Sequence, residues 1–250
     1  LASGSKGNSA LISTGKQNFL VDMGISCKML TSRLKEVGFS VEDLDGIFLT
    51  HEHTDHVKGL ATFTKKHTVP IYSSELTWRA ILSKEPKIER RNCRIISGAL
   101  KCGEVEINSF EIPHDAADPH GYVFKCNGSK CAYITDTGFV TPAVRQAAED
   151  ADTIILEANH DVEMLKNGIY PPHLKQRILS TRGHLSNESA GWLLAHLPRL
   201  PENIILAHLS QENNLPRLAL DTVRNILDGA SLFNEARIIV AAQDRIVKDY

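Results

Sequence analysis

The chain has 250 residues, of which 42% are hydrophobic and 23% are charged. This balance excludes a disordered or fibrous protein, and the net charge of -2 gives no sign of a general affinity for nucleic acids or membranes. No apolar run approaches the roughly 18 residues of a transmembrane helix, and no signal peptide is visible. The five cysteines form no C-x-x-C pair, so we expect free thiols, a cytoplasmic location and no membrane partner.

Strand-like and helix-like segments alternate along the whole chain. Short apolar and β-branched runs predict strands at residues 9–13, 19–22, 47–50, 69–72, 105–112, 121–126, 131–135, 153–156, 204–207 and 238–241. Helical periodicity predicts helices at residues 26–37, 57–66, 75–83, 142–149, 187–196 and 215–227. Antiparallel hairpins combined with strand–helix–strand units predict an α/β (α+β) fold with two mixed β-sheets and outer helices, as a single domain over residues 1–250.

The sequence THEHTDH, at residues 50–56, places three histidines and an aspartate directly after a short apolar strand. His51 and His53 lie two residues apart, so their side chains point the same way if the backbone is extended. Asp55 and His56 are then free to serve a second metal ion. Other predicted strands are also followed by a histidine or a carboxylate, namely His114, Asp136, Glu157 and His208. Because strand ends cluster at one edge of a sheet, we expect these side chains to converge.

Imidazole and carboxylate together suit zinc, manganese or iron. Five histidines and two aspartates suffice for two divalent ions with positions left open for water, whereas a structural zinc site is usually closed by four ligands. The expected metal ligands are His51, His53, Asp55, His56, His114, Asp136 and His208. The sequence leaves the choice between Zn²⁺ and Mn²⁺ open.

This ligand pattern resembles that of the metallo-β-lactamase superfamily over nearly the whole chain. The resemblance implies an αββα four-layer sandwich with the metals at one edge, and residues 20–24 (LVDMG) resemble the family's early strand with its structural aspartate. It implies one ion on His51, His53 and His114, a second ion on Asp55, His56 and His208, and Asp136 as the bridge.

Further stretches resemble particular branches of that superfamily. Residues 1–9 (LASGSKGNS) resemble the opening of the PhnP-like phosphodiesterases and of the bacterial YycJ (WalJ, VicX) group. Residues 156–161 (LEANHD) and 183–187 (GHLSN) also resemble the YycJ group. Glu157 and His184 are similar to the glutamate and histidine that the tRNase Z branch carries beside its metals.

Paired metal ions lower the pKa of a shared water and hold a phosphate for in-line attack. We therefore expect a phosphodiester hydrolase, foremost a DNA or RNA exonuclease that uses a metal-bridging hydroxide. The catalytic candidates are Asp55, Glu157 and His184, with His184 protonating the leaving group and Glu157 orienting it. His184 can also be read as a simple helix-entry residue beside a cap. The alternatives are a hydrolase of small cyclic phosphodiesters and a regulatory or scaffold protein whose catalysis is vestigial.

A basic segment at residues 166–182, expected to be a loop, contains Tyr170, Lys175, Arg177 and Arg182. It could hold the phosphate backbone of a nucleic acid, the expected substrate, or be a solvated connector. Ser3 and Ser5 could line the pocket, because the glycines around them allow a close approach.

Overall fold

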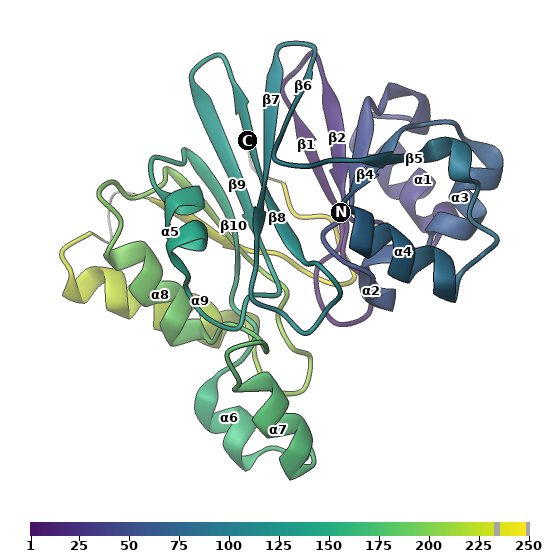
Figure 1. The fold of residues 1–250 in the computed structure, drawn as a ribbon. Helices are drawn as coiled ribbons and strands as arrows, with labels where there is room; N and C mark the ends of the chain where they lie inside the picture. The colour runs from purple at the N-terminus through teal and green to yellow at the C-terminus, as the bar shows by residue number, and fades with distance from the viewer. Residues whose placement is uncertain (233–235, 249–250) are drawn as a thin grey trace.

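Two β-sheets lie face to face with helices on their outer sides in the computed structural model, which describes residues 1–232 and 236–248 (Figure 1). One sheet has the strand order β1-β2-β3-β4-β5, and the other has the order β12-β11-β10-β9-β8-β7-β6. Each sheet joins parallel and antiparallel pairs, since β1–β2 is antiparallel beside parallel β2–β3, and β8–β9 is antiparallel beside parallel β9–β10. The predicted mixed sheets are therefore confirmed.

The five-stranded sheet carries its helices on one face. Its strands are β1 (Ala10–Ser13), β2 (Asn18–Val21), β3 (Gly46–Phe48), β4 (Ile71–Ser73) and β5 (Cys93–Ile95). The helices of this half are α1 (Cys27–Glu36), α2 (Thr54–Val57), α3 (Leu60–Lys66) and α4 (Glu75–Lys84), with short 3₁₀ turns η1 (Val41–Asp43) and η2 (Arg90–Asn92).

The seven-stranded sheet forms the other half. Its strands are β6 (Ala99–Cys102), β7 (Val105–Glu111), β8 (His120–Cys126), β9 (Ser129–Ile134), β10 (Thr153–Glu157), β11 (Asn203–Ala207) and β12 (Arg237–Val240). Helices α5 (Pro142–Ala148), α8 (Asn187–Ala195) and α9 (Pro216–Gly229) cover its outer face, while α6 (Val162–Asn167) and α7 (Pro172–Ile178) form a helical hairpin that stands away from both sheets (Figure 1).

Both faces of the central strands are buried, which explains their continuous apolar sequences. Leu20 and Ile47 pack against the helices, whereas Phe19 and Phe48 point into the layer between the sheets. The Phe48 ring contacts Tyr122 of β8 with centroids 5.4 Å apart, and the Phe19 ring contacts Phe124 of β8 with centroids 5.7 Å apart. These aromatic rings fix how the two sheets sit against each other, and with them the ends of their strands.

Most predicted elements are confirmed to within a few residues, but three expectations are wrong. The helix expected at 57–66 is split into α2 and α3, and α2 already begins at Thr54 inside the histidine motif. Strands β5 and β6 were not predicted, because they are short and largely exposed. The segment expected to be a loop contains α7, which begins at Pro172, where a missing backbone N–H costs no helical hydrogen bond.

The thiols of Cys27, Cys93, Cys102 and Cys126 are free, as expected. Within the described residues, every helix is too short or too polar to span a bilayer.

Candidate metal centre

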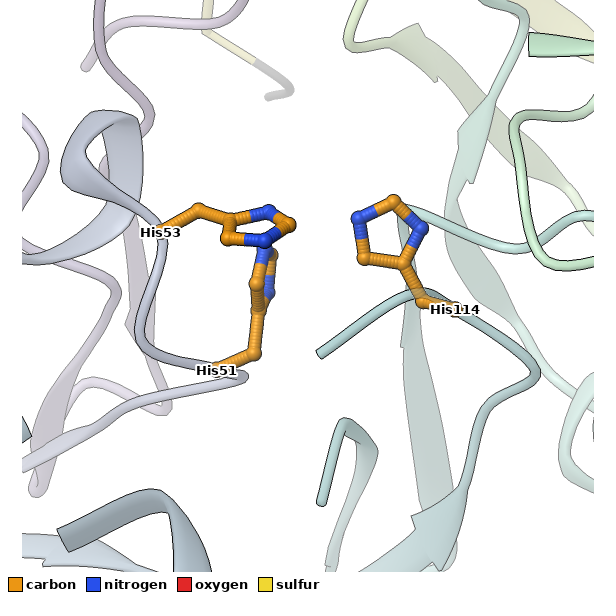
Figure 2. Close-up of side chains that lie close together, drawn as sticks. All are labelled: His51, His53 and His114. Atoms are coloured by element: carbon orange, nitrogen blue, oxygen red, sulfur yellow. The ribbon is translucent and has the colours of Figure 1, made fainter. Parts of the chain in front are cut away.

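The histidine motif leaves β3 as a loop and then turns into α2. His51 and His53 lie on the loop, while Asp55 and His56 lie on α2. The rings of His51 and His53 nevertheless converge, with centroids 4.5 Å apart, and both face His114, which follows β7 (Figure 2). One ligand atom from each of these three histidines lies within 4.8 Å of the others.

Hydrogen bonds fix the ring orientation of this histidine group. The Nδ1 atom of His114 lies 3.0 Å from the carbonyl oxygen of Gly183, which can only accept a hydrogen bond. His114 therefore carries its proton on Nδ1 and keeps Nε2 free as a ligand. The Nδ1 atom of His51 contacts the Thr50 hydroxyl at 3.0 Å, and its buried Nε2 atom has no hydrogen-bond partner among the described residues.

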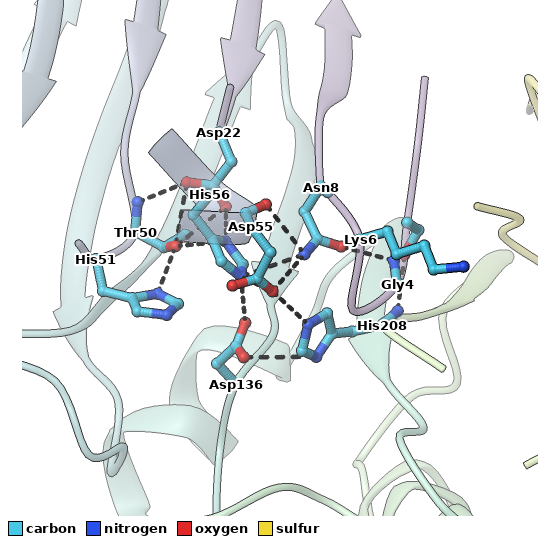
Figure 3. Close-up of polar contacts among 12 residues, drawn as sticks. Gly4, Lys6, Asn8, Asp22, Thr50, His51, Asp55, His56, Asp136 and His208 are labelled. Carbon is cyan, nitrogen blue, oxygen red and sulfur yellow. Dashed lines mark hydrogen bonds and ion pairs between the residues drawn. The ribbon is translucent and has the colours of Figure 1, made fainter. Parts of the chain in front are cut away.

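A second group is formed by Asp55, His56 and His208 (Figure 3). His56 contacts the fully buried Asp22 carboxylate through Nδ1 at 2.8 Å, so its Nε2 atom faces the group. The Oδ2 atom of Asp55 lies 3.3 Å from Nε2 of His56 and 3.4 Å from Nε2 of His208.

Asp136 lies between the two groups. Its Oδ2 atom is 3.3 Å from Nε2 of His56, and its Oδ1 atom is 3.7 Å from Nε2 of His114. Although Oδ2 is buried, it has no hydrogen-bond partner among the described residues. A buried, unpartnered carboxylate oxygen aimed at an imidazole nitrogen is an arrangement that a bound cation would satisfy.

The electrostatics of the cluster suit metal binding. Burial, together with repulsion from His56 and His114, holds the pKa of His51 well below its usual range, so the imidazole stays neutral, the form that binds a metal. Burial alone would raise the pKa of Asp55, but attraction to His56 and a hydrogen bond from His208 outweigh it and lower the pKa. Burial lowers the pKa of His114 as well. Burial would also lower the pKa of His56 and His208, but the charge of Asp136 outweighs it and raises both, so a bound ion would have to displace their protons. The neutral His51 and His114 imidazoles, the ionised carboxylates and the unpartnered buried atoms together fit divalent cations.

Glu157 holds two histidines at once. Its Oε1 atom is 2.8 Å from Nδ1 of His184 and 2.9 Å from Nδ1 of His208. Its Oε2 atom accepts hydrogen bonds from the backbone N–H groups of Thr137 and Leu185. Burial would raise the pKa of Glu157, but the charge and the hydrogen bond of His184 outweigh it and keep the carboxylate ionised. The Nε2 atom of His208 in turn contacts Asp55, whereas His184 lines the adjoining cavity.

The predicted substrate residues are arranged unequally around this cavity. Ser5, Tyr170 and Arg177 line it together with His53, Asp55, Asp136, His184 and His208. Ser3 instead uses its hydroxyl to accept the backbone N–H of His208 at 2.7 Å.

The other two basic candidates bind the protein's own backbone. Lys175 donates its ammonium to the Lys166 carbonyl at 2.7 Å, and Arg182 donates Nε–H to the His114 carbonyl at 3.3 Å. Their hydrogen bonds support the α6–α7 hairpin and the His114 loop.

Sequence reasoning missed Asn8 and Asp115. The Nδ2 atom of Asn8 lies 3.3 Å from Oδ2 of Asp55 and 3.2 Å from Nε2 of His56. Its loop reaches α2 only because Gly24 has no side chain there, since a Cβ atom would lie 1.6 Å from the Asp55 carbonyl oxygen. Asp115 forms a two-point ion pair with Arg177 of α7. The one sequence signal for it is its position directly after His114.

The fold and this cluster define a class of protein. A family model described as the beta-lactamase superfamily domain matches residues 17–209, and the chain belongs to the metallo-β-lactamase superfamily.

Within that superfamily, two curated relatives match nearly the whole chain. The chain is 41% identical over 231 residues to exodeoxyribonuclease YycJ of Bacillus anthracis, covering 91% of this chain and 88% of that protein. It is 42% identical over 237 residues to exodeoxyribonuclease WalJ of Streptococcus pneumoniae, covering 93% of this chain and 88% of that protein. The predicted resemblance to the YycJ group is confirmed.

A solved structure shares the fold at low sequence identity. The metallo-β-lactamase fold protein YhfI from Bacillus subtilis superposes with a TM-score of 0.70 at 18% identity, covering 97% of this chain and 89% of that one. The predicted metallo-β-lactamase fold is thereby confirmed.

Proposed function

We propose that this protein is a metal-dependent phosphodiester hydrolase and that its substrate is DNA, degraded from an end. One structural observation carries the proposal: two groups of metal-ligand atoms flank a buried aspartate whose oxygens face both. The near full-length similarity to two exodeoxyribonucleases supports DNA as the substrate class.

The ligand assignment follows from these two groups. His51, His53 and His114 would hold one divalent ion, Asp55, His56 and His208 a second, and Asp136 would contact both. Zn²⁺ and Mn²⁺ both accept this set of nitrogen and oxygen donors. Bound ions would supply the positive charge that neutralises a phosphate and acidifies a water molecule.

The remaining catalytic roles belong to side chains that face the cavity. Asp55 lines the cavity with a partly exposed carboxylate, which suits it to accept a hydrogen bond from the attacking water and so orient it. His184 can present Nε2 to the departing alkoxide, because its Nδ1 atom is occupied by Glu157. Glu157 is a positioning residue: it is fully buried and touches the two histidines rather than the substrate.

Linear and circular DNA of the same sequence test this function. The purified protein, loaded with Zn²⁺ or Mn²⁺, should release nucleotides from end-labelled linear strands and leave closed circles intact. The Asp136→Asn variant is the matched control for a contaminating nuclease. Cleavage of circles would replace the exonuclease with an endonuclease, and inertness towards all DNA at full metal content would overturn the proposal.

The same assay includes the alternatives. Turnover of RNA or of a small cyclic phosphodiester in preference to DNA would reassign the substrate while keeping the reaction. A protein that binds metal but hydrolyses none of these would be the vestigial form, which the complete donor set argues against.

A further inference from the structure

We propose that Tyr170 and Arg177 form a subsite for the nucleotide next to the scissile phosphate, with the base stacked on Tyr170 and its phosphate held by Arg177. The proposal rests on the function proposed above and deepens it. It assigns the α6–α7 hairpin to recognition of an unpaired nucleotide, and it assigns Asp115 the task of positioning Arg177.

The cavity lining joins two kinds of chemistry. Candidate ligands and His184 belong to the metal centre, whereas the hairpin segment contributes Tyr170, Leu174, Arg177 and Ile178. A ligand with a phosphate at one end and a flat apolar ring at the other matches this division. A nucleotide has that shape, whereas a bare phosphate ester would leave the hairpin residues unused.

Tyr170 lies at the tip of the hairpin, where the backbone is restricted. It lies between α6 and α7 and is followed by Pro171 and Pro172, which restrict the backbone. The hairpin is closed by the hydrogen bond from the Lys175 ammonium to the Lys166 carbonyl. A backbone that is already restricted leaves less entropy to be lost when a base stacks on the ring. Every base offers a face, so the subsite would not select a sequence.

Arg177 is placed for phosphate by its ion pair with Asp115. Its Nε and Nη2 groups donate to the two Asp115 oxygens, with Nη2 3.0 Å from Oδ1. A guanidinium has five N–H donors in a fixed plane, so donors remain for a phosphate. Asp115 directly follows the candidate ligand His114, and its Oδ1 atom lies 3.4 Å from Nε2 of that histidine. The pair therefore fixes a positive group beside the metal cluster.

A stacked base has to be unpaired. The subsite therefore predicts a preference for single-stranded or frayed ends over a fully paired duplex end. It also predicts that the hairpin contributes to cleavage of polymers in a way that depends on the base.

The base contact is tested by combining a Tyr170 variant with a substrate that lacks the base. Tyr170→Ala should lower kcat/KM on a single-stranded oligonucleotide about 5- to 150-fold, the equivalent of 1–3 kcal/mol of base–aromatic stacking. On an oligonucleotide whose terminal residues are abasic, the ratio of wild-type to Tyr170→Ala kcat/KM should approach one, because no base is left to stack. Tyr170→Phe retains the ring and should retain most of the activity.

The controls separate a lost contact from a damaged fold. His173→Ala, at an exposed position of the same hairpin, should leave kcat/KM unchanged on both substrates. Equal penalties for Tyr170→Ala on normal and abasic strands, or no penalty on either, would overturn the subsite while leaving the nuclease function in place. A wild-type protein that cleaves no DNA would overturn the proposed function instead, and the subsite with it.

The phosphate contact has its own readout. Arg177→Ala should raise KM for the oligonucleotide more than it lowers kcat, and the slope of log KM against log salt should become shallower by about 0.7, the value for one phosphate contact to a single strand. Asp115→Asn should cause a smaller change in the same direction, because it loosens the guanidinium without removing it. An unchanged salt slope in Arg177→Ala would show that the arginine does not contact phosphate. Loss of bound metal would show that the arginine serves the metal site rather than the substrate.

Discussion

Three residues of the candidate metal centre have a left-handed backbone conformation, which most residue types avoid. Asp22, Asp136 and His208 have φ values of 62°, 58° and 56°, and each follows a strand within two residues. Such left-handed conformations cost about 1–3 kcal/mol each and persist where the surroundings enforce them. The sharp turn aims each side chain into the cluster instead of along the strand direction.

Asp136 gives the sharpest test of the centre. Asp136→Asn should abolish hydrolysis and lower metal content, because the amide keeps the shape but loses the negative charge that balances two cations. Asparagine tolerates positive φ, so Asp136→Asn should stay folded. Asp136→Ala loses the same negative charge and also strains the backbone. Metal analysis and turnover are measured together. Near-normal turnover at full metal occupancy would show that Asp136 is not the bridge.

His184 is tested through the leaving group. His184→Ala should keep both metals and slow DNA cleavage by about 10²- to 10⁴-fold, the usual contribution of a general acid or base. The defect should shrink with a nitrophenyl phosphodiester, since nitrophenolate departs without a proton. Equal slowing with both substrates argues against the acid role, and loss of metal would make His184 a ligand.

At this scale the sequence identified every residue that follows an apolar strand. The seven candidate ligands and Glu157 are predicted in that way, His184 is predicted from the family resemblance of residues 183–187, and the structure brings all nine together. Asn8 and Asp115 could not be found so, because they reach the cluster through contacts between loops far apart in the chain.

At the scale of elements, the buried strands are predictable from the sequence and the hairpin is not. Strands buried on both faces leave continuous apolar runs, as in Ile154-Ile155-Leu156. Helices α6 and α7 have only 6 and 7 residues, and such short helices are marginal without tertiary contacts. Gly168, Pro171 and Pro172 are also typical of a loop. The hairpin that lines part of the cavity is therefore hard to predict from the sequence.

The end of β3 is held by a hydrogen bond between the sheets. The Leu49 carbonyl, just before the histidine motif, accepts from the Tyr122 hydroxyl of β8 at 2.6 Å and from the Ser73 hydroxyl of β4 at 3.1 Å. Tyr122→Phe and Ser73→Ala should each lower the free energy of unfolding by about 1 kcal/mol, since one donor remains. The double variant should lose about 1–3 kcal/mol beyond the sum, because a buried carbonyl is then unpaired. Denaturant titration measures this, and strict additivity would mean that water replaces the lost donors.

At the scale of the whole molecule, the candidate ligands come from both sheets. His51, His53, Asp55 and His56 follow β3 of one sheet, whereas His114, Asp136 and His208 follow β7, β9 and β11 of the other. Bound ions would therefore join the two halves at the edge where the strands end. The aromatic layer around Phe48 joins the same halves without any metal. The fold should thus survive metal removal but lose stability.

Chelation tests this coupling. A ligand present at about 1,000 times its Kd stabilises the folded state by about 4 kcal/mol, and a domain of about 150–250 residues shifts its Tm by about 2–4 °C per kcal/mol. Removing the metals should therefore lower Tm by about 8–16 °C for each ion held at that level, while the far-UV circular dichroism at 20 °C stays native. Asp136→Asn, already poor in metal, should respond much less. If elemental analysis shows that the ions are gone and Tm has not moved, the metals do not join the sheets, and the aromatic layer alone holds them together.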